Sequence, residues 1–275
     1  MPTKVAFQGA RGAFSEEAAR QLLGADLKYV PCERFEEVFQ ALADGKVSRA
    51  VIPIENTLAG SVHENYDHLL KFGLPIIAET RVRIVHNLIV RPKTKFSDIQ
   101  RVLSHPVALG QCLDFFSKNC HLNSEVFYDT AGSVKHIMQE GDTSLAAIAS
   151  TTAAEYYGGR ILRRSIEDDH RNFTRFFLLA RKAPRRLPEG TLQTSIVFST
   201  RNTPGALFKC MGAFALRNID LLKIESRPLR GQPWEYLFYV DFAGSPEEER
   251  CQSAMSDLSK ITELLVVLGC YPQIK

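Results

Sequence analysis

The sequence predicts an α/β protein whose first part alternates strands and helices and whose last part follows the order βαββαβ. In the first part, short apolar runs that end in small polar residues alternate with amphipathic helical patterns, which favours mostly parallel sheets. From residue 192 onward the order is strand, helix, two strands, helix and strand, which is typical of a ferredoxin-like domain.

A stretch rich in Pro, Arg and Gly, "RKAPRRLPEG", separates the two patterns. The chain has 275 residues, which is long enough for two domains of ordinary size. We therefore predict a first domain over residues 1–182, a linker over 183–191 and a second domain over 192–275.

The first domain opens with a strand, "KVAFQG", that ends at Gly9. Ser15 is placed to cap the following helix, whose first turn carries two carboxylates that suit the helix dipole. Apolar residues at i, i+3, i+4 and i+7 then predict a helix that ends at Gly45. The next predicted elements are strand 49–56, helix 62–70 and an extended segment over 75–91.

Strand–helix alternation resumes after residue 100. The strand in "RVLSHP" leads into one predicted helix over 106–119, with Pro106 at a helix-starting position. The stretches "EVFYDTAGSVKHIMQEG" and "SLAAIASTTAAEYYG" each contain a strand, a small polar turn and a helix. The apolar run that follows Asn172 predicts one more buried strand.

The second domain begins with the strand "TSIVFST" and a helix whose first residue is Pro204. The strands "LLKIESRP" and "WEYLFYVDFAG" are joined by the hairpin-like "LRGQP". A helix opened by Ser245 and Pro246 and the strand "LLVVLGCYP" complete the order.

Composition and charge exclude several classes of protein. A net charge of +3 without a long basic run argues against nucleic acid, and no window reaches the roughly 18 apolar residues of a membrane span. The six cysteines form no C-x-x-C pair and the histidines are scattered, so we expect no metal site. The N-terminus has no apolar targeting segment. We expect a cytoplasmic protein with reduced thiols and no nucleic-acid or membrane partner.

Small polar turns follow five predicted strands, at residues 9–12, 55–57, 104–106, 129–133 and 149–152. Ligands of open α/β sheets lie beyond the carboxyl ends of the strands, and helix N-termini favour anions. Taken singly, each turn is better explained as an ordinary helix cap than as a ligand contact. Taken together they predict a cleft for a small anion. The third glycine of a dinucleotide fingerprint is missing after Gly9 and Gly12.

The five residues "NFTRF" place an arginine between two phenylalanines where a buried strand begins. A guanidinium is rarely left unpaired in a protein core. Arg175 therefore either reaches solvent at the mouth of the strand or meets an anion there.

Six motifs make the chain resemble the prephenate dehydratases. "PIENTLAGSV", "SHPVALGQC", "YDTAGS" and "NFTRF" are similar to signatures of that family's catalytic domain, and "GALF" and "ESRP" to the two motifs of its regulatory ACT domain. The pattern covers residues 4–273 in family order. The resemblance implies a two-lobed catalytic domain like the periplasmic binding proteins, with its active site in the cleft, and a C-terminal ACT domain. It also implies conversion of prephenate to phenylpyruvate, water and carbon dioxide, without a metal or an organic cofactor.

The motif matches imply the residues of the site. The implied catalytic set is Thr174, Arg175, Asn56, Gln111 and Ser104. The implied substrate contacts are Glu55, Thr57, Thr130, Phe173 and Phe176. We expect Thr174 to act as an oriented hydrogen-bond donor to the departing hydroxyl, because a threonine is too weak an acid to protonate it alone. Successive strand residues point to opposite faces, so Arg175 either grips a substrate carboxylate or organises loops behind the strand. Glu55 is either a loop-organising acceptor or part of a proton relay.

The resemblance further implies feedback inhibition by L-phenylalanine at the ACT domain. The expected effector contacts are Asn202, Gly205, Ala206, Leu207, Glu225, Ser226 and Arg227. Backbone amides at the start of the first ACT helix can cap an amino acid's carboxylate. The "ESRP" motif completes the pocket from a neighbouring subunit, so the implied assembly is a homodimer or a homotetramer.

Two other functions fit the same sequence. Arogenate dehydratase performs the same chemistry on a substrate with an amino group in place of the keto group. A non-catalytic amino-acid sensor on the same scaffold is permitted by the fold alone, although it does not need the hydroxyl of Thr174.

Overall fold

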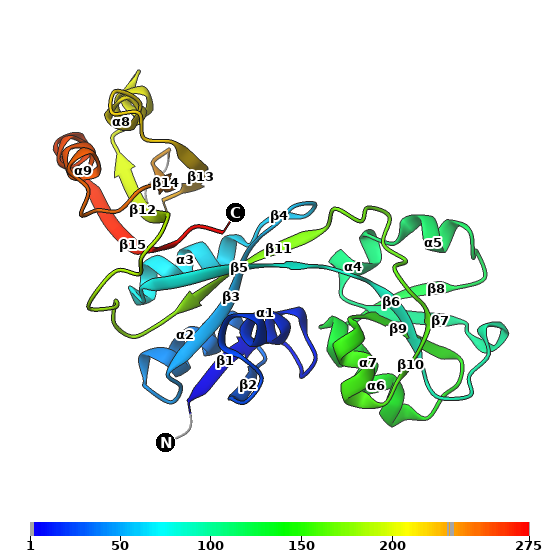
Figure 1. The fold of residues 1–275 in the computed structure, drawn as a ribbon. Helices are drawn as coiled ribbons and strands as arrows, with labels where there is room; N and C mark the ends of the chain where they lie inside the picture. The colour runs from blue at the N-terminus through cyan, green and yellow to red at the C-terminus, as the bar shows by residue number, and fades with distance from the viewer. Residues whose placement is uncertain (1–2, 230, 232–233, 275) are drawn as a thin grey trace. The chain divides into compact units, whose positions relative to one another are not determined.

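The computed structural model describes residues 3–229, 231 and 234–274. The chain divides into two compact units: the first comprises residues up to 66 together with 80–178, and the second comprises 67–79 and 179–275. Figure 1 shows the order of the helices and strands along the chain.

A six-stranded sheet with the order β2-β1-β3-β11-β5, and β4 paired to β3, forms the first lobe. Its strands are β1 (Lys4–Gln8), β2 (Lys28–Cys32), β3 (Arg49–Asn56), β4 (Gly60–Ser61), β5 (Ile76–Arg83) and β11 (Phe173–Leu179). Its helices are α1 (Phe14–Leu23), α2 (Phe35–Ala43) and α3 (His63–Phe72). Strand β1 runs parallel to both β2 and β3, and α1 and α2 pack against β1 and β3. The carboxyl ends of β1 and β3 therefore lie at the same edge of the sheet.

A five-stranded sheet with the order β10-β6-β9-β7-β8 forms the second lobe. Its strands are β6 (Asn87–Val90), β7 (Arg101–Ser104), β8 (Asn123–Val126), β9 (Leu145–Ala149) and β10 (Arg160–Arg163). Its helices are the 3-10 helix η1 (Phe96–Asp98), α4 (Pro106–Gly110), α5 (Leu113–Ser117), α6 (Thr130–Glu140) and α7 (Thr151–Tyr157). The chain passes between the two lobes twice, over residues 84–86 and 164–172.

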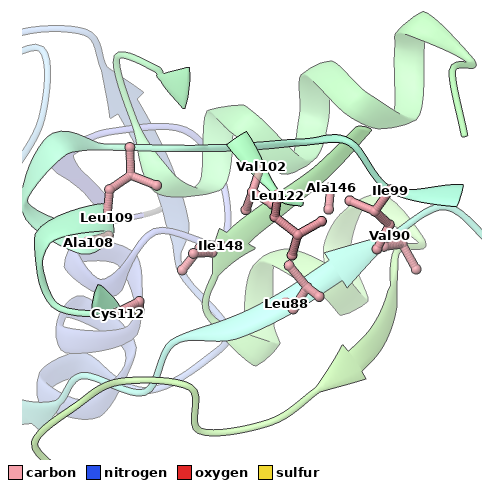
Figure 2. Close-up of a cluster of buried hydrophobic side chains, with 10 residues drawn as sticks. All are labelled: Leu88, Val90, Ile99, Val102, Ala108, Leu109, Cys112, Leu122, Ala146 and Ile148. Carbon is pink, nitrogen blue, oxygen red and sulfur yellow. The ribbon is translucent and has the colours of Figure 1, made fainter. Parts of the chain in front are cut away.

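The core of the second lobe is a cluster of ten buried side chains from β6, β7, β9, α4 and the loops beside them. Figure 2 shows Leu88, Val90, Val102 and Ile148 directed toward one another inside the lobe. Burial of each such side chain stabilises the fold by roughly 1.5–3 kcal/mol. This packing holds α4 against the sheet, and α4 leads directly to Gln111.

A four-stranded antiparallel sheet with the order β13-β14-β12-β15 belongs to the second unit. Its elements follow the order β12 (Leu192–Thr200), α8 (Ala206–Ala215), β13 (Leu221–Pro228), β14 (Tyr236–Ala243), α9 (Glu249–Ile261) and β15 (Leu264–Pro272). The predicted βαββαβ order is therefore confirmed. Both helices contribute to one core with the sheet, in which Phe198, Phe214, Phe242 and Leu258 are buried.

Three helix starts differ from the prediction. Ser15 lies inside α1, whose N-cap is Ala13, and the carboxylate of Glu16 accepts the backbone N–H of Gly12 at 2.9 Å. Helix α8 begins after Gly205, and α9 begins at Glu249, four residues after Ser245. The three helices therefore begin at other residues than the capping pattern of the sequence predicted. Part of the predicted hairpin over residues 229–233 lies outside the described residues.

The single helix predicted over 106–119 is instead two short helices, α4 and α5, interrupted at Gln111 and Cys112. The carboxylate of Asp168 accepts the backbone N–H groups of Leu113 and Asp114 at 2.8 and 3.0 Å. Asp168 also donates its own N–H to the carbonyl of Gln111 at 2.8 Å. A segment far along the chain therefore caps the second helix, and the interruption places Gln111 where its side chain can face a cavity.

Candidate active site

A cavity of about 400 Å³ lies within the first unit. Its walls come from both lobes and from the first segment that passes between them. The residues that line it include Ala13, Phe14, Phe35, Asn56, Val62, Thr174, Ile84, His86, His105, Val107, Gln111, Asp129 and Thr130. Such a volume suits a small organic molecule.

The hydroxyl of Thr174 lines this cavity from β11, and the residue is 9% exposed. The side-chain amide of Asn56, at the end of β3, donates to Thr174 Oγ1 at 2.9 Å. Asn56 Oδ1 accepts the backbone N–H groups of Leu58 and Ala59 at 3.0 and 2.8 Å. Because Thr174 Oγ1 accepts from Asn56, the hydroxyl proton is left for another acceptor.

Gln111 connects the second lobe to this pair. Its Nε2 donates to Asn56 Oδ1 at 3.4 Å, and its Oε1 accepts from Asn172 Nδ2 at 2.9 Å. Asn56 Nδ2 also donates to Asn172 Oδ1 at 2.7 Å. Three carboxamides from β3, the end of α4 and the second segment between the lobes thus form one cluster beside Thr174.

Two histidines line the cavity. His86 is 2% exposed, and its Nε2 lies 2.9 Å from Gln111 Oε1. Burial lowers the pKa of the His86 imidazole below its usual value, although Gln111 and Glu167 act in the opposite direction. Burial also lowers the pKa of His105, against a smaller opposing effect of Asp129. Both rings are therefore neutral near pH 7.

Two of the predicted polar turns connect the lobes to each other. The carboxylate of Asp129 accepts the backbone N–H of Ala10 at 2.7 Å and that of Gly132 at 3.2 Å. Ser150 Oγ donates to the carbonyl of Gly12 at 2.7 Å and accepts from the N–H of Ala153. These side chains therefore act both as helix caps and as contacts across the cleft.

The structure brings four of the ten residues that the motifs implied for this site to the cavity wall. They are Asn56, Gln111, Thr130 and Thr174. The other six do not line the cavity: Glu55, Thr57, Ser104, Phe173, Arg175 and Phe176. Ser104 is fully buried and donates to the carbonyl of Ile148 at 2.6 Å, which explains its place inside the second lobe.

Thr57 joins β3 to the segment before β11. Its Oγ1 donates to the carbonyl of Arg171 at 2.8 Å and accepts the N–H of Phe173 at 3.0 Å. Glu55 lies on the face of β3 opposite to Asn56, because neighbouring strand residues alternate. Phe173 is 38% exposed and Phe176 is buried.

Arg175 lies on the face of β11 opposite to Thr174. Its guanidinium carbon is 4.8 Å from the ring centre of Phe177, two residues further along the same face. This placement does not support the substrate contact that the motif implied for Arg175, and it agrees with the alternative role behind the strand. Strand alternation is the physical reason, since Thr174 and Arg175 cannot share one face.

His86 and Asn172 complete the cluster but carry no predicted role from the sequence. His86 and Asn87 are polar residues inside the apolar run "RIVHNLIV" and are both buried. A polar pair in the middle of an apolar run is the signal that identifies such a position. Asn172 is fully buried next to Thr174, where only the fold reveals its contacts.

A second cavity of about 240 Å³ lies in the second unit, at the N-terminus of α8. Four residues that the sequence predicted as effector contacts line it: Asn202, Gly205, Ala206 and Leu207. Tyr236 and Phe238 of β14 also contribute to its wall. Gly205, with φ at 79°, caps the helix in a left-handed conformation that favours glycine.

The "ESRP" residues do not line this cavity. The carboxylate of Glu225 is 3.7 Å from Lys223 Nζ, and Ser226 is exposed. Arg227 Nη2 lies 3.1 and 3.0 Å from the two carboxylate oxygens of Asp67. Within one chain, the two predicted effector motifs are therefore separate.

Among residues 3–229, 231 and 234–274, no cluster of three or more His, Cys, Asp or Glu side chains is arranged to hold a metal ion. In the same described part of the chain, no helix has the length and apolar character needed to span a bilayer.

A family model described as prephenate dehydratase matches residues 5–184. The chain belongs to the prephenate dehydratase family. A relative from Arabidopsis thaliana, named arogenate dehydratase/prephenate dehydratase 2, chloroplastic, is 45% identical over 98% of this chain and 72% of its own length. Membership of this family makes the chain a lyase.

Two similar solved structures have a TM-score of 0.90. One is the prephenate dehydratase of Arthrobacter aurescens in complex with L-Phe, which is 31% identical over 98% of this chain and 90% of that chain. The other is described as a novel type of quorum quenching acylase and is 35% identical over 98% of each chain. The predicted two-lobed, periplasmic-binding-protein-like fold followed by a βαββαβ domain is confirmed.

The expectation of a cytoplasmic protein is contradicted. The relatives from Arabidopsis thaliana at 45% and 41% identity are named chloroplastic. Targeting segments are not part of a folded domain, so the strand pattern that begins at Lys4 is no guide to the compartment.

Proposed function

We propose that the chain converts prephenate to phenylpyruvate, water and carbon dioxide in phenylalanine biosynthesis. The bond from the ring to its carboxylate breaks, and its electron pair moves into the ring. As this happens, the bond from the ring to the hydroxyl breaks at the opposite carbon with its electron pair, and the hydroxide takes up one proton to leave as water. Formation of the aromatic ring drives both steps, so the reaction needs no nucleophile and no electron sink.

The observation that carries this proposal is the hydrogen-bonding state of Thr174. Its Oγ1 accepts from Asn56 Nδ2 at 2.9 Å, and the residue lines the cavity. The proton of Thr174 is therefore available to the departing hydroxyl, where charge develops in the transition state. Because a threonine is a weak acid, Thr174 stabilises the leaving oxygen, and the proton that balances the reaction is supplied finally by water.

The walls of the cavity suit both carboxylates of the proposed substrate, the one on the ring and the one on the side chain. Phe14, Phe35, Val62, Ile84 and Val107 form apolar surface, which disfavours a charged ring carboxylate relative to neutral carbon dioxide. The N-termini of α1 and α6 reach the cavity at Ala13 and Thr130, and helix N-termini favour an anion such as the side-chain carboxylate.

Arogenate is the second candidate substrate, because the relative at 45% identity is named for both activities. The two substrates differ only in the group next to the side-chain carboxylate, which is a keto group in prephenate and an ammonium in arogenate. Asn56 Nδ2 donates to Asn172 and Thr174, and Gln111 Nε2 donates to Asn56, so these hydrogen bonds fit either substrate equally.

We also propose that L-phenylalanine inhibits the enzyme from the second cavity. The solved prephenate dehydratase of Arthrobacter aurescens is a complex with L-Phe. The start of α8 supplies backbone N–H groups for a carboxylate, and Tyr236 and Phe238 supply aromatic surface. Inhibition requires that phenylalanine bind the less active conformation more tightly than the active one.

We propose that residues 183–191 link a catalytic domain over 1–182 to an ACT domain over 192–275. We further propose a homodimer or a homotetramer, in which Glu225, Ser226 and Arg227 of one subunit complete the effector cavity of another. Light scattering with and without phenylalanine measures this assembly.

The experiment that tests the proposed function compares turnover of prephenate and arogenate by the wild type and by Thr174→Ala. We expect the wild type to prefer prephenate and Thr174→Ala to lose about 10²–10³ in kcat while it still binds substrate. Preference for arogenate establishes the second candidate. A Thr174→Ala variant as fast as the wild type removes Thr174 from the chemistry, and turnover of neither compound rejects the enzyme function.

A further inference from the structure

The direction of a side-chain amide must be assigned from its hydrogen bonds, because its oxygen and nitrogen are nearly alike in shape. At Asn56 the assignment follows from the backbone. The N–H groups of Leu58 and Ala59 can only donate, and both point to Asn56 Oδ1 at 3.0 and 2.8 Å. Asn56 therefore directs its NH₂ group toward Asn172 and Thr174.

This direction passes to the other amides of the cluster. Asn56 Nδ2 lies 2.7 Å from Asn172 Oδ1, so the NH₂ group of Asn172 faces the opposite way, toward Gln111. Asn172 Nδ2 is 2.9 Å from Gln111 Oε1, so Gln111 accepts at that atom. Gln111 then turns its own NH₂ group toward Asn56 Oδ1, at 3.4 Å. The amide directions are thus determined in sequence, starting from two backbone groups.

The last group in this series of hydrogen bonds is the imidazole of His86. Its Nε2 lies 2.9 Å from Gln111 Oε1, an atom that can only accept, so Nε2 carries the proton. His86 Nδ1 is buried and has no hydrogen-bond partner among the described residues. A second proton on Nδ1 would be buried without an acceptor, which keeps the ring in its neutral form.

We propose, on the basis of the proposed function, that His86 is a positioning residue that holds Gln111 with its NH₂ group toward Asn56 and the cavity. Gln111 then offers the substrate a hydrogen-bond donor. Rotation of this amide would present Oε1 to Asn56 Oδ1, and two acceptors would face each other beside an anionic substrate. His86 and Asn172 together satisfy both lone pairs of Oε1 in the productive orientation.

The test uses two substitutions of His86 with opposite expectations. His86→Leu removes the donor, and we expect kcat/KM to fall about tenfold, the effect of one hydrogen bond. His86→Gln returns an N–H group near the position of Nε2, and we expect kcat/KM within about threefold of the wild type. His121→Leu, on the exposed surface of the second lobe, is the matched control and leaves kcat/KM unchanged. A His86→Leu variant as active as the wild type overturns the proposal, as does a His86→Gln variant no better than His86→Leu.

A double-mutant cycle separates positioning from general stability. If His86 acts through Gln111, adding His86→Leu to a Gln111→Leu variant lowers kcat/KM little further. The effects of the two substitutions on kcat/KM are then strongly non-additive. Full additivity contradicts the proposal.

The tautomer gives a readout that does not depend on activity. Long-range ¹H–¹⁵N spectra of the wild type, with the His86 signal assigned by comparison with His86→Gln, are expected to show the proton on Nε2. A proton on Nδ1 overturns the proposal even where His86→Leu fails to fold. A wild type that turns over neither substrate rejects the proposed function, while these spectra still decide the orientation of the cluster.

Discussion

The proposed substrate cavity and the proposed effector cavity each lie at the start of a helix that follows a glycine with a left-handed backbone. Gly12, with φ at 83°, precedes α1, and Gly205, with φ at 79°, precedes α8. A Cβ atom on Gly12 would lie 2.6 Å from the Cα of Ala153, whereas one on Gly205 would meet nothing within 4 Å. The first helix start is thus packed between two lobes, and the second is open.

The two cavities also differ in the number of chain segments that form their walls. The cavity of the first unit depends on side chains from β3, β11, α4 and the segment around His86, which are far apart in the sequence. Most of the second cavity comes from the continuous segment over residues 200–208, with two aromatic residues of β14. The residues of a cavity that one segment forms can therefore be recognised from a sequence motif. The residues of a cavity that many segments form are identified only from the folded structure.

The strongest effect is expected at the centre of the amide cluster. Asn56→Asp keeps Oδ1, and hence the bonds from Leu58 and Ala59, but replaces the donor to Thr174 by an acceptor. The Thr174 proton then turns to the new carboxylate, and we expect kcat to fall about 10²–10³-fold. Steady-state kinetics measure this loss. Asn119→Asp, whose amide donates to the carbonyl of Phe115, is the control, and an equal loss there would contradict the assignment.

The next effect concerns the packed helix start. We expect Gly12→Ala to lower the free energy of unfolding by about 3 kcal/mol, since backbone strain and overpacking against Ala153 add. Urea unfolding followed by circular dichroism measures it. Gly24→Ala has a similar φ, at 87°, and nothing within 4 Å of the added Cβ, so it shows the cost of the positive φ without a close contact. Equal losses for both variants would show that Ala153 is not a close neighbour.

A substitution at the open start of α8 should lower the free energy of unfolding less than Gly12→Ala does. We expect Gly205→Ala to cost about 1 kcal/mol, because the added Cβ has free space and only the backbone conformation is strained. The same urea experiment checks this value. A loss as large as that of Gly12→Ala would remove the contrast between the two cavities.

The weakest effect is a pH dependence at His86. Its pKa is lowered by burial, although Gln111 accepts from the ring and Glu167 lies nearby. Glu167 accepts the backbone N–H of His86 and faces Arg83 and His170, and the ring of Phe14 packs edge-on against His86. Between the lowered pKa and the ordinary value of about 6.5, the unfolded chain binds more protons than the folded one.

The stability contributed by neutral His86 is therefore present above about pH 6.5 and is lost as the pH falls below it. Urea unfolding of the wild type and His86→Gln at several pH values measures the difference. We expect the wild type to lose stability faster than the variant toward acid pH. Parallel curves would show that His86 does not titrate with a lowered pKa.

Much of the fold and part of the site were predictable from the sequence. The apolar periodicity identified α2, β3 and β15, and the change in element order identified the βαββαβ part. Thr174, Asn56 and Gln111 were expected in the site and do line the cavity. Ser104 and Arg175 carry the right residue types, but their side chains lie inside the second lobe and behind β11.

The order of strands and helices follows from the amino-acid sequence, because side-chain periodicity is a local property of the chain. The sequence motifs also identify Asn56 and Gln111, which lie beside Thr174 in the site. Contacts in the folded chain were needed to show that the predicted helix is interrupted at Gln111 and Cys112, where Asp168 caps the second part. They were also needed to show that two backbone N–H groups orient Asn56, and through it Asn172 and Gln111. Hydrogen bonds between segments far apart in the chain have no local pattern, so the tautomer of His86 follows from the fold alone.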